Sequence, residues 1–173
     1  MEPHAAGATP AGPGRTVTTD DLCRLAAELK EVRRAGWLRV GNSAPESVAD
    51  HSYGVALLAL LRCPLELDRG RLLIMAILHD LAEVRVGDIT PHDGVPAEEK
   101  HRREDEVMAA LLVDRPELLA LWREAEAQQT PEARFLKEMD RLDMRLQAER
   151  YAATGRISAV DAGEFMRSST RED

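Results

Sequence analysis

A histidine and an aspartate stand side by side at the end of the most apolar run in the chain. Residues 72–78 read LLIMAIL, and His79 and Asp80 follow them directly. A buried charge is costly unless it is paired or bound to a metal, so this doublet needs an explanation. Adjacent helical side chains point about 100° apart, yet an imidazole and a shorter carboxylate can converge on one ion beside the helix. The pattern therefore indicates a metal-ligand pair that interrupts a buried helix.

Two acidic residues follow the doublet at distances that suit a role beside a metal. If the helix continues, Glu83 lies one turn beyond His79 on the same face. Asp88 then follows the helix end, where residues 88–94 (DITPHDG) contain too many helix breakers to continue it. A loop of about ten residues is long enough to be functional. Glu83 and Asp88 are therefore further candidate residues of the metal site.

Residues from two other predicted helices could complete the coordination of a metal. His51 lies in the first turns of the helix before the doublet, and Asp140 adjoins the apolar stripe of the last long helix. The set His51, His79, Asp80 and Asp140 supplies nitrogen and oxygen ligands suited to Mn, Co, Fe, Zn or Mg, and no thiolate. The alternative interpretation is a hydrogen-bonded pair at His79-Asp80 within a charge network, with the other acids on the solvated surface.

Helical periodicity and capping residues place these candidates in an all-α fold. We expect helices over about 20–35, 46–62, from the cap Asp68 through the doublet, from Pro96, over 116–128, and from the cap Thr130 to about Gly155. Residues 36–45, which include an exposed Trp37, are expected to form a loop. The prediction is a single bundle of about six helices over residues 17–167, with a disordered leader (1–16) and a flexible tail (168–173).

Composition narrows the class of protein. The chain has 173 residues, 44% hydrophobic and only 3% aromatic, which favours one soluble helical domain. A net charge of −8 argues against a nucleic-acid polymer as partner, and no apolar run approaches the roughly 20 residues needed to cross a bilayer. Cys23 and Cys63 form no CxxC pattern and are expected to be small core residues. We therefore expect a cytoplasmic location.

The joint pattern of these residues resembles the HD-domain superfamily, and more specifically its 5′-deoxynucleotidase branch. The resemblance runs from about Leu22 to Phe165 and rests on five segments: 46–52 (ESVADHS), 78–83 (LHDLAE), 86–89 (VGDI), 98–104 (EEKHRRE) and 135–140 (FLKEMD). In that family the H, HD and D residues bind one divalent metal. The resemblance assigns these roles to His51, His79, Asp80 and Asp140.

The resemblance also implies roles for residues around the metal. Family members place the equivalents of Glu83 and Asp88 at the phosphate and the attacking water. Some members hold a second cation there, which in this chain implies Glu83, Asp88 and the carbonyl of Ile89. The Trp that packs on the sugar and disfavours a ribose 2′-hydroxyl corresponds to Trp37. The phosphate-binding Arg that directly precedes this Trp in some members is replaced here by Gly36, so Arg34 or Arg33 is the candidate.

Together these residues predict a metal-dependent phosphomonoesterase that converts nucleoside 5′-monophosphates, preferentially deoxy ones, to nucleoside and phosphate. One alternative is a phosphatase dedicated to a modified nucleotide in a nucleoside natural-product pathway, which the displaced Arg would permit. Another is a non-catalytic nucleotide-binding HD protein, although a pure binder has no need of Glu83. Proteins similar to this one are often homodimers, so the resemblance implies a second copy of the chain as a partner.

Overall fold

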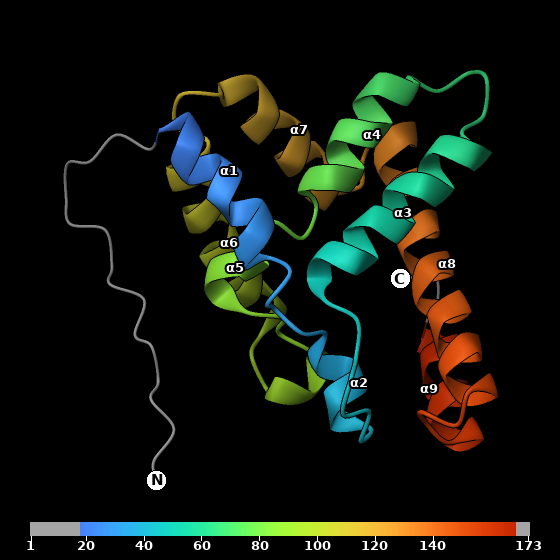
Figure 1. Cartoon of the computed structure of the whole chain (residues 1–173). Coiled ribbons are helices and arrows are strands. Elements are labelled where there is room, and N and C mark those ends of the chain that lie inside the picture. Colours follow the sequence, from blue (N-terminus) through green and yellow to red (C-terminus); the bar gives the residue numbers. More distant parts are fainter. Residues whose placement is uncertain (1–17, 169–173) are drawn as a thin grey trace, which may run out of the picture.

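The computed structural model describes residues 18–168, and helices dominate this part of the chain (Figure 1). The predicted leader at 1–16 and all of the predicted tail except Ser168 lie outside the described residues. The helices in chain order are α1 (Thr19–Glu28), α2 (Ala35–Arg39), α3 (Val48–Arg62), α4 (Arg69–Leu78), α5 (Glu83–Val86), a 3-10 turn η1 (Pro91–Asp93), α6 (Ala97–Leu111), α7 (Pro116–Ala127), α8 (Pro131–Ala153) and α9 (Ala159–Ser168). The prediction of an all-α bundle is confirmed.

Capping residues start the predicted helices close to the expected positions. Ser47 caps α3 through a capping box with Asp50, so that the side chain of each accepts a hydrogen bond from the backbone N–H of the other. Asp68 caps α4 and Thr130 caps α8, as expected from the sequence. These caps fix where α3, α4 and α8 begin, and so where His51 lies on α3, Asp140 on α8 and the doublet just after α4.

The first predicted helix is shorter in the structure than expected. α1 ends at Glu28 instead of near residue 35, and the chain then turns until Arg33 pairs with Ser47 in an isolated antiparallel bridge. The predicted loop at 36–45 contains the short helix α2, and Trp37 in this helix is only 2% exposed, so its prediction as an exposed loop residue was wrong. The indole is buried because Tyr151 and Phe165 from α8 and α9 pack against it. The sequence did not predict α9.

The central core is formed by α3, α4 and α8, with α7 covering one end (Figure 1). Its buried side chains are Val55, Ala59, Leu72, Met75, Ala76, Ala125, Leu136, Met139 and Leu142. The apolar run of α4 supplies three of them, but its Ile74 and Ile77 are exposed, so α4 is buried on one side only. The first turns of α3, the end of α4 and the middle of α8 therefore meet at the edge of this core.

Two smaller expectations had different outcomes. Cys23 is exposed and Cys63 is partly buried, so the prediction of a core position was wrong for Cys23. Cys23 lies on α1, whose core-facing position is taken by Leu25. Among the described helices, none combines the length and the apolar character that a membrane crossing requires.

Candidate metal centre and active site

His79 and Asp80 lie just beyond the end of α4. The sequence predicts a longer helix that runs through both residues, and this prediction was wrong. His79 is the C-cap residue of α4, and a turn over residues 79–82 leads into α5. The indole N–H of the buried Trp122 donates a hydrogen bond to the carbonyl oxygen of His79 at 3.1 Å. The turn lets both side chains of the doublet face the same point, with His79 Nε2 3.3 Å from Asp80 Oδ2.

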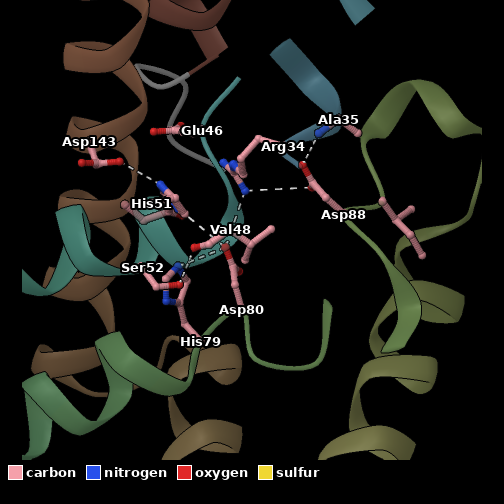
Figure 2. A network of polar contacts seen from close by, with 12 residues as sticks. Arg34, Ala35, Glu46, Val48, His51, Ser52, His79, Asp80, Asp88 and Asp143 are labelled. Carbon is pink, nitrogen blue, oxygen red and sulfur yellow. Dashed lines mark hydrogen bonds and ion pairs between the residues drawn. The ribbon is translucent and has the colours of Figure 1, made fainter. Parts of the chain in front are cut away.

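Four side chains from α3, the turn after α4, and α8 converge on this point. The Nε2 atom of the fully buried His51 lies 3.2 Å from Asp140 Oδ1 and 3.6 Å from Asp80 Oδ2. One ligand atom each from His51, His79 and Asp140 all lie within 4.8 Å of one another. Figure 2 shows His51 on α3 pointing toward the adjacent side chains of His79 and Asp80. The structure thus brings together all four residues that the sequence predicted as metal ligands.

The hydrogen bonding of the two imidazoles leaves one nitrogen of each available to a cation. His79 Nδ1 lies 2.8 Å from the carbonyl oxygen of Ala76, and His51 Nδ1 lies 2.8 Å from Asp143 Oδ2. Both Nε2 atoms are buried and have no hydrogen-bond partner among the described residues. Unpaired buried nitrogens that face carboxylates are the arrangement expected of histidine ligands held by their other nitrogen. The residues present therefore fit a divalent metal.

Electrostatic interactions within this cluster are strong because water is largely excluded. Burial and the nearby Arg34 lower the pKa of His51, but its polar contacts with the carboxylates of Asp140 and Asp143 outweigh them and raise it to about 9. Burial would raise the pKa of Asp80, yet the interactions with His79 and His51 hold it well below its usual range. The carboxylates that face the imidazoles are therefore ionised at neutral pH, as metal ligands must be, and a cation that binds His51 must displace the Nε2 proton.

Glu83 is the first residue of α5, and its side chain is only 3% exposed. The turn between α4 and α5 means that Glu83 is not one helical turn beyond His79, contrary to expectation. Its Oε2 atom has no hydrogen-bond partner among the described residues. Burial, together with the negative charges of Asp80 and Asp88, raises its pKa well above the usual value. A buried carboxyl group with a raised pKa beside a candidate metal centre is suited to proton transfer.

A buried arginine connects the doublet to Asp88 (Figure 2). Arg34 Nη1 lies 3.5 Å from Asp80 Oδ2 and 3.9 Å from Asp88 Oδ1, and its side chain is 16% exposed. Burial would lower the pKa of Arg34, but the surrounding carboxylates raise it. Asp88 Oδ2 also accepts a hydrogen bond from the backbone N–H of Ala35 at 2.7 Å. Arg33 is exposed and does not line the adjoining cavity, so the structure places Arg34, and not Arg33, at the site.

A cavity of about 370 Å³ opens beside these residues. Its walls come from α2, the doublet, α5 and the loop after it, α6, α8 and α9. The lining residues are Arg34, Gly36, Trp37, Arg39, Asp80, Glu83, Asp88, Ile89, Thr90, Pro91, His92, Lys100, Lys137, Asp140, Arg141, Met144, Glu164 and Phe165. The volume falls in the range of small-molecule sites. Arg34, Asp80, Glu83, Asp88 and Asp140 line this cavity, whereas His51 and His79 lie behind Asp80 and Asp140 and do not.

Comparison with known proteins identifies the family of the chain. Residues 26–173 match a family model described as HD domain. The chain belongs to the HD domain family. It is 46% identical over 133 residues to the bovine 5′-deoxynucleotidase HDDC2, a match that covers 74% of this chain. The same match covers 65% of the bovine protein, so the chain spans just under two thirds of the length of that relative.

Solved structures contain the same HD domain fold. A conserved hypothetical protein of Pyrococcus furiosus superposes with a TM-score of 0.75 at 34% identity, and the match covers 87% of each chain. A protein of Magnetospirillum magnetotacticum described as a predicted metal-dependent phosphohydrolase gives a TM-score of 0.62 at 26% identity, over 87% of this chain and 85% of the other. The overall helical fold of the chain is therefore shared with both solved structures.

Some residues of this HD domain that contact the site were not singled out from the sequence. Asp143 lies one turn after Asp140 on α8, and this i+3 spacing could have identified it. Lys137 Nζ lies 2.8 Å from Asp140 Oδ2, and Lys100 Nζ donates to the carbonyl oxygen of Ile89 at 3.2 Å. No local signal indicated Glu46 as the partner of the Trp37 indole, because its 2.8 Å hydrogen bond depends on where α2 packs.

Proposed function

We propose that this HD domain is a divalent-metal-dependent phosphomonoesterase that hydrolyses nucleoside 5′-monophosphates, preferentially deoxy ones. The observation that carries the proposal is the pair of unpaired, buried Nε2 atoms of His51 and His79 facing Asp80 and Asp140 at the wall of a cavity. The names of the curated relatives support the substrate class, and the cavity size suits a mononucleotide.

In this proposal His51, His79, Asp80 and Asp140 hold the metal. Two imidazoles and two carboxylates form a mixed set that accepts Mn, Co, Fe, Zn or Mg. A cation bound there supplies a Lewis acid that polarises the phosphoryl group and lowers the pKa of water. A phosphate positioned by the cluster lies at the same end of the cavity as the Arg34 guanidinium, which can bind two of its oxygens in a bidentate manner.

Glu83 and Asp88 carry the proton transfers in this mechanism. The raised pKa of the buried Glu83 carboxyl suits it to orient the attacking water and accept its proton. Asp88, held by Ala35 and close to Arg34, would take up a proton from solvent and pass it to the leaving 5′-oxygen. A second cation bound by Glu83, Asp88 and the carbonyl of Ile89 would compete with the ammonium group of Lys100, which donates a hydrogen bond to that carbonyl.

The sugar is proposed to lie at the end of the cavity formed by α2 and α9. Trp37 and Phe165 line this end, and their ring centroids are 4.1 Å apart. The indole is fixed by the hydrogen bond from Nε1 to Glu46 and by its edge contact with Tyr151. The two rings offer no hydrogen-bond partner to an added 2′-hydroxyl, and the polar side chains at this end, Arg39 and Glu164, are paired with each other, which favours deoxyribose.

Phosphate release from a panel of ribo- and deoxyribonucleoside 5′-monophosphates tests the function. With Mn, Co or Mg added, we expect release that a chelator abolishes and that is faster for the deoxy substrates, with little effect of the base. Nucleoside 3′-monophosphates are the control and should not react at a comparable rate. The absence of release from every 5′-monophosphate with every metal would rule out the proposed hydrolase.

We also propose that two copies of the chain associate through an exposed apolar face on α3 and α4. On α3, Tyr53, Leu57 and Leu61 recur at helical spacing and are 70%, 39% and 72% exposed, and Ile77 of the adjoining α4 is 61% exposed. Apolar groups gathered on one face are typical of association surfaces, and a two-fold dimer needs only one self-complementary face.

Light scattering checks this association. The wild-type protein should have twice the 19.2 kDa mass of the chain, and Leu61→Asp should reduce it to that of a single chain because a charge cannot be buried in the interface. Val160→Asp changes an equally exposed residue on α9 and should leave the dimer intact. A wild-type protein that is monomeric at micromolar concentration would contradict the proposal.

A further inference from the structure

The side of His51 that faces away from the candidate metal position has a partner of its own. His51 Nδ1 lies 2.8 Å from Asp143 Oδ2, whereas its Nε2 lies 3.2 Å from Asp140 Oδ1. Asp140 and Asp143 are three residues apart on α8 and therefore lie on one face of that helix. Figure 2 shows Asp143 reaching His51 from α8. Two carboxylates from one turn of α8 therefore contact the two nitrogens of the same buried imidazole.

A glycine on α3 makes room for this contact. Gly54 lies three residues after His51, and a Cβ atom at this position would lie 2.2 Å from Asp143 Oδ1 and 2.9 Å from Asp143 Cγ. Contacts this short would force the carboxylate to move. Glycine weakens the interior of a helix, so helix stability gives no reason for glycine at position 54. The space that the missing side chain leaves is occupied by the carboxylate that contacts His51.

We propose that Asp143 is a positioning residue for the metal centre. Gly54 is glycine because the Asp143 carboxylate occupies the space that a side chain at position 54 would need. By accepting the Nδ1 proton, Asp143 fixes the tautomer in which His51 Nε2 carries the free electron pair. His79 is held in the same way by the backbone carbonyl of Ala76. The proposal rests on the proposed function, since it assumes that His51 is a metal ligand. It assigns a role to two residues that do not contact the metal.

The surroundings of Asp143 favour this role over ligation of a separate ion. Glu46, His51 and Asp143 each have a ligand atom within 4.8 Å of the others. The Glu46 carboxylate, however, already accepts a hydrogen bond from the Trp37 indole at 2.8 Å. An ion in this second group would also need His51 Nδ1 without its proton. The short contact of Nδ1 with Asp143 is therefore assigned to orientation of the ring.

Binding of Co²⁺ to the purified full chain, measured by calorimetry and by the visible spectrum of the bound ion, tests the proposal without any substrate. Asp143→Ala should weaken Co²⁺ binding by about 10- to 100-fold and alter the spectrum, because the ring of His51 is no longer oriented. Asp143→Asn should recover part of the affinity, since its amide oxygen can still accept the Nδ1 proton. Equal affinity and an identical spectrum for wild type and Asp143→Ala would overturn the proposal.

The glycine is tested by a double-mutant cycle. Gly54→Ala should weaken Co²⁺ binding about as much as Asp143→Ala does, yet have less than about a twofold effect when Asp143 is already Ala, because no carboxylate remains to be displaced. Gly163→Ala, within α9, is the control and should leave binding unchanged. If Gly54→Ala still weakened Co²⁺ binding in the Asp143→Ala background, the proposal that Gly54 makes room for the Asp143 carboxylate would be contradicted. Circular dichroism and the melting temperature of each metal-free variant report whether it folds. If Gly54→Ala alone folds poorly, the double variant still tests the proposal, because it lacks the clash between the alanine Cβ and the Asp143 carboxylate.

The outcomes separate this proposal from the proposed function. Failure of the wild-type chain to bind Co²⁺ would contradict the metal centre itself, and the positioning role with it. Wild-type binding that the Asp143 and Gly54 variants do not weaken would overturn only the positioning role. Weakened binding in both variants would support the positioning role even if no nucleotide released phosphate.

Discussion

Asp80→Asn should abolish metal-dependent phosphate release, with a loss of on the order of 10³-fold or more in kcat/KM. Asp80 Oδ2 lies 3.3 Å from His79 Nε2, 3.6 Å from His51 Nε2 and 3.5 Å from Arg34 Nη1, so its charge contacts both imidazoles and the proposed phosphate-binding arginine. Asparagine keeps the shape but removes the charge that a divalent cation requires. The variant should bind metal weakly and turn over slowly.

Metal-induced stabilisation provides a second readout of the same substitution. A ligand that binds only the folded state raises the melting temperature, so saturating Mn or Co should stabilise the wild type and leave Asp80→Asn nearly unchanged. Asp105→Asn is the matched control, since Asp105 forms an ion pair with Arg123 and lines neither the cavity nor the space beside the doublet. A wild-type response to metal in Asp80→Asn, with phosphate release retained, would contradict the proposed ligand set.

Helices with strong local signals were predictable from the sequence. α4, α7 and α8 begin at a cap or a first-turn proline, and their apolar residues recur at helical spacing. α2 and α9 have weaker signals, and they are stabilised by contacts with each other. Trp37 on α2 packs against Phe165 on α9. Because this packing joins residues more than a hundred positions apart, no local pattern could predict that the indole is buried.

The residue types of the site were also predictable, whereas their arrangement was not. A His-Asp doublet after an apolar run indicated ligands, but the turn that ends α4 at Leu78 has no Gly or Pro to mark it. Tertiary contacts set this turn: the Trp122 indole binds the His79 carbonyl, and α5 packs against α6. Arg34 could be chosen over Arg33 only from the structure, since the bridge between Arg33 and Ser47 decides which of the two faces the cavity.

Glu83→Gln should lower kcat by about 10²- to 10⁴-fold with a much smaller change in KM, because proton transfer and not substrate binding is lost. Glu83 is nearly completely buried, its Oε2 atom lacks a hydrogen-bond partner among the described residues, and the charges of Asp80 and Asp88 raise its pKa together with burial. A cation bound to Asp80 would neutralise its charge and so remove one cause of the raised pKa of Glu83. The carboxyl group is then better able to lose its proton and act as a base.

The stability of the variant distinguishes a catalytic role for Glu83 from a structural one. A buried carboxylate without a full set of partners destabilises the fold, so Glu83→Gln should keep or raise the melting temperature while activity falls. Glu124→Gln is the control: Glu124 is partly buried, pairs with Arg71, and lines neither the proposed nucleotide cavity nor the space beside the doublet. Its activity should stay close to that of the wild type. If Glu83→Gln lost activity only in proportion to a loss of folded protein, Glu83 would be structural, and the base would have to be sought at Asp88.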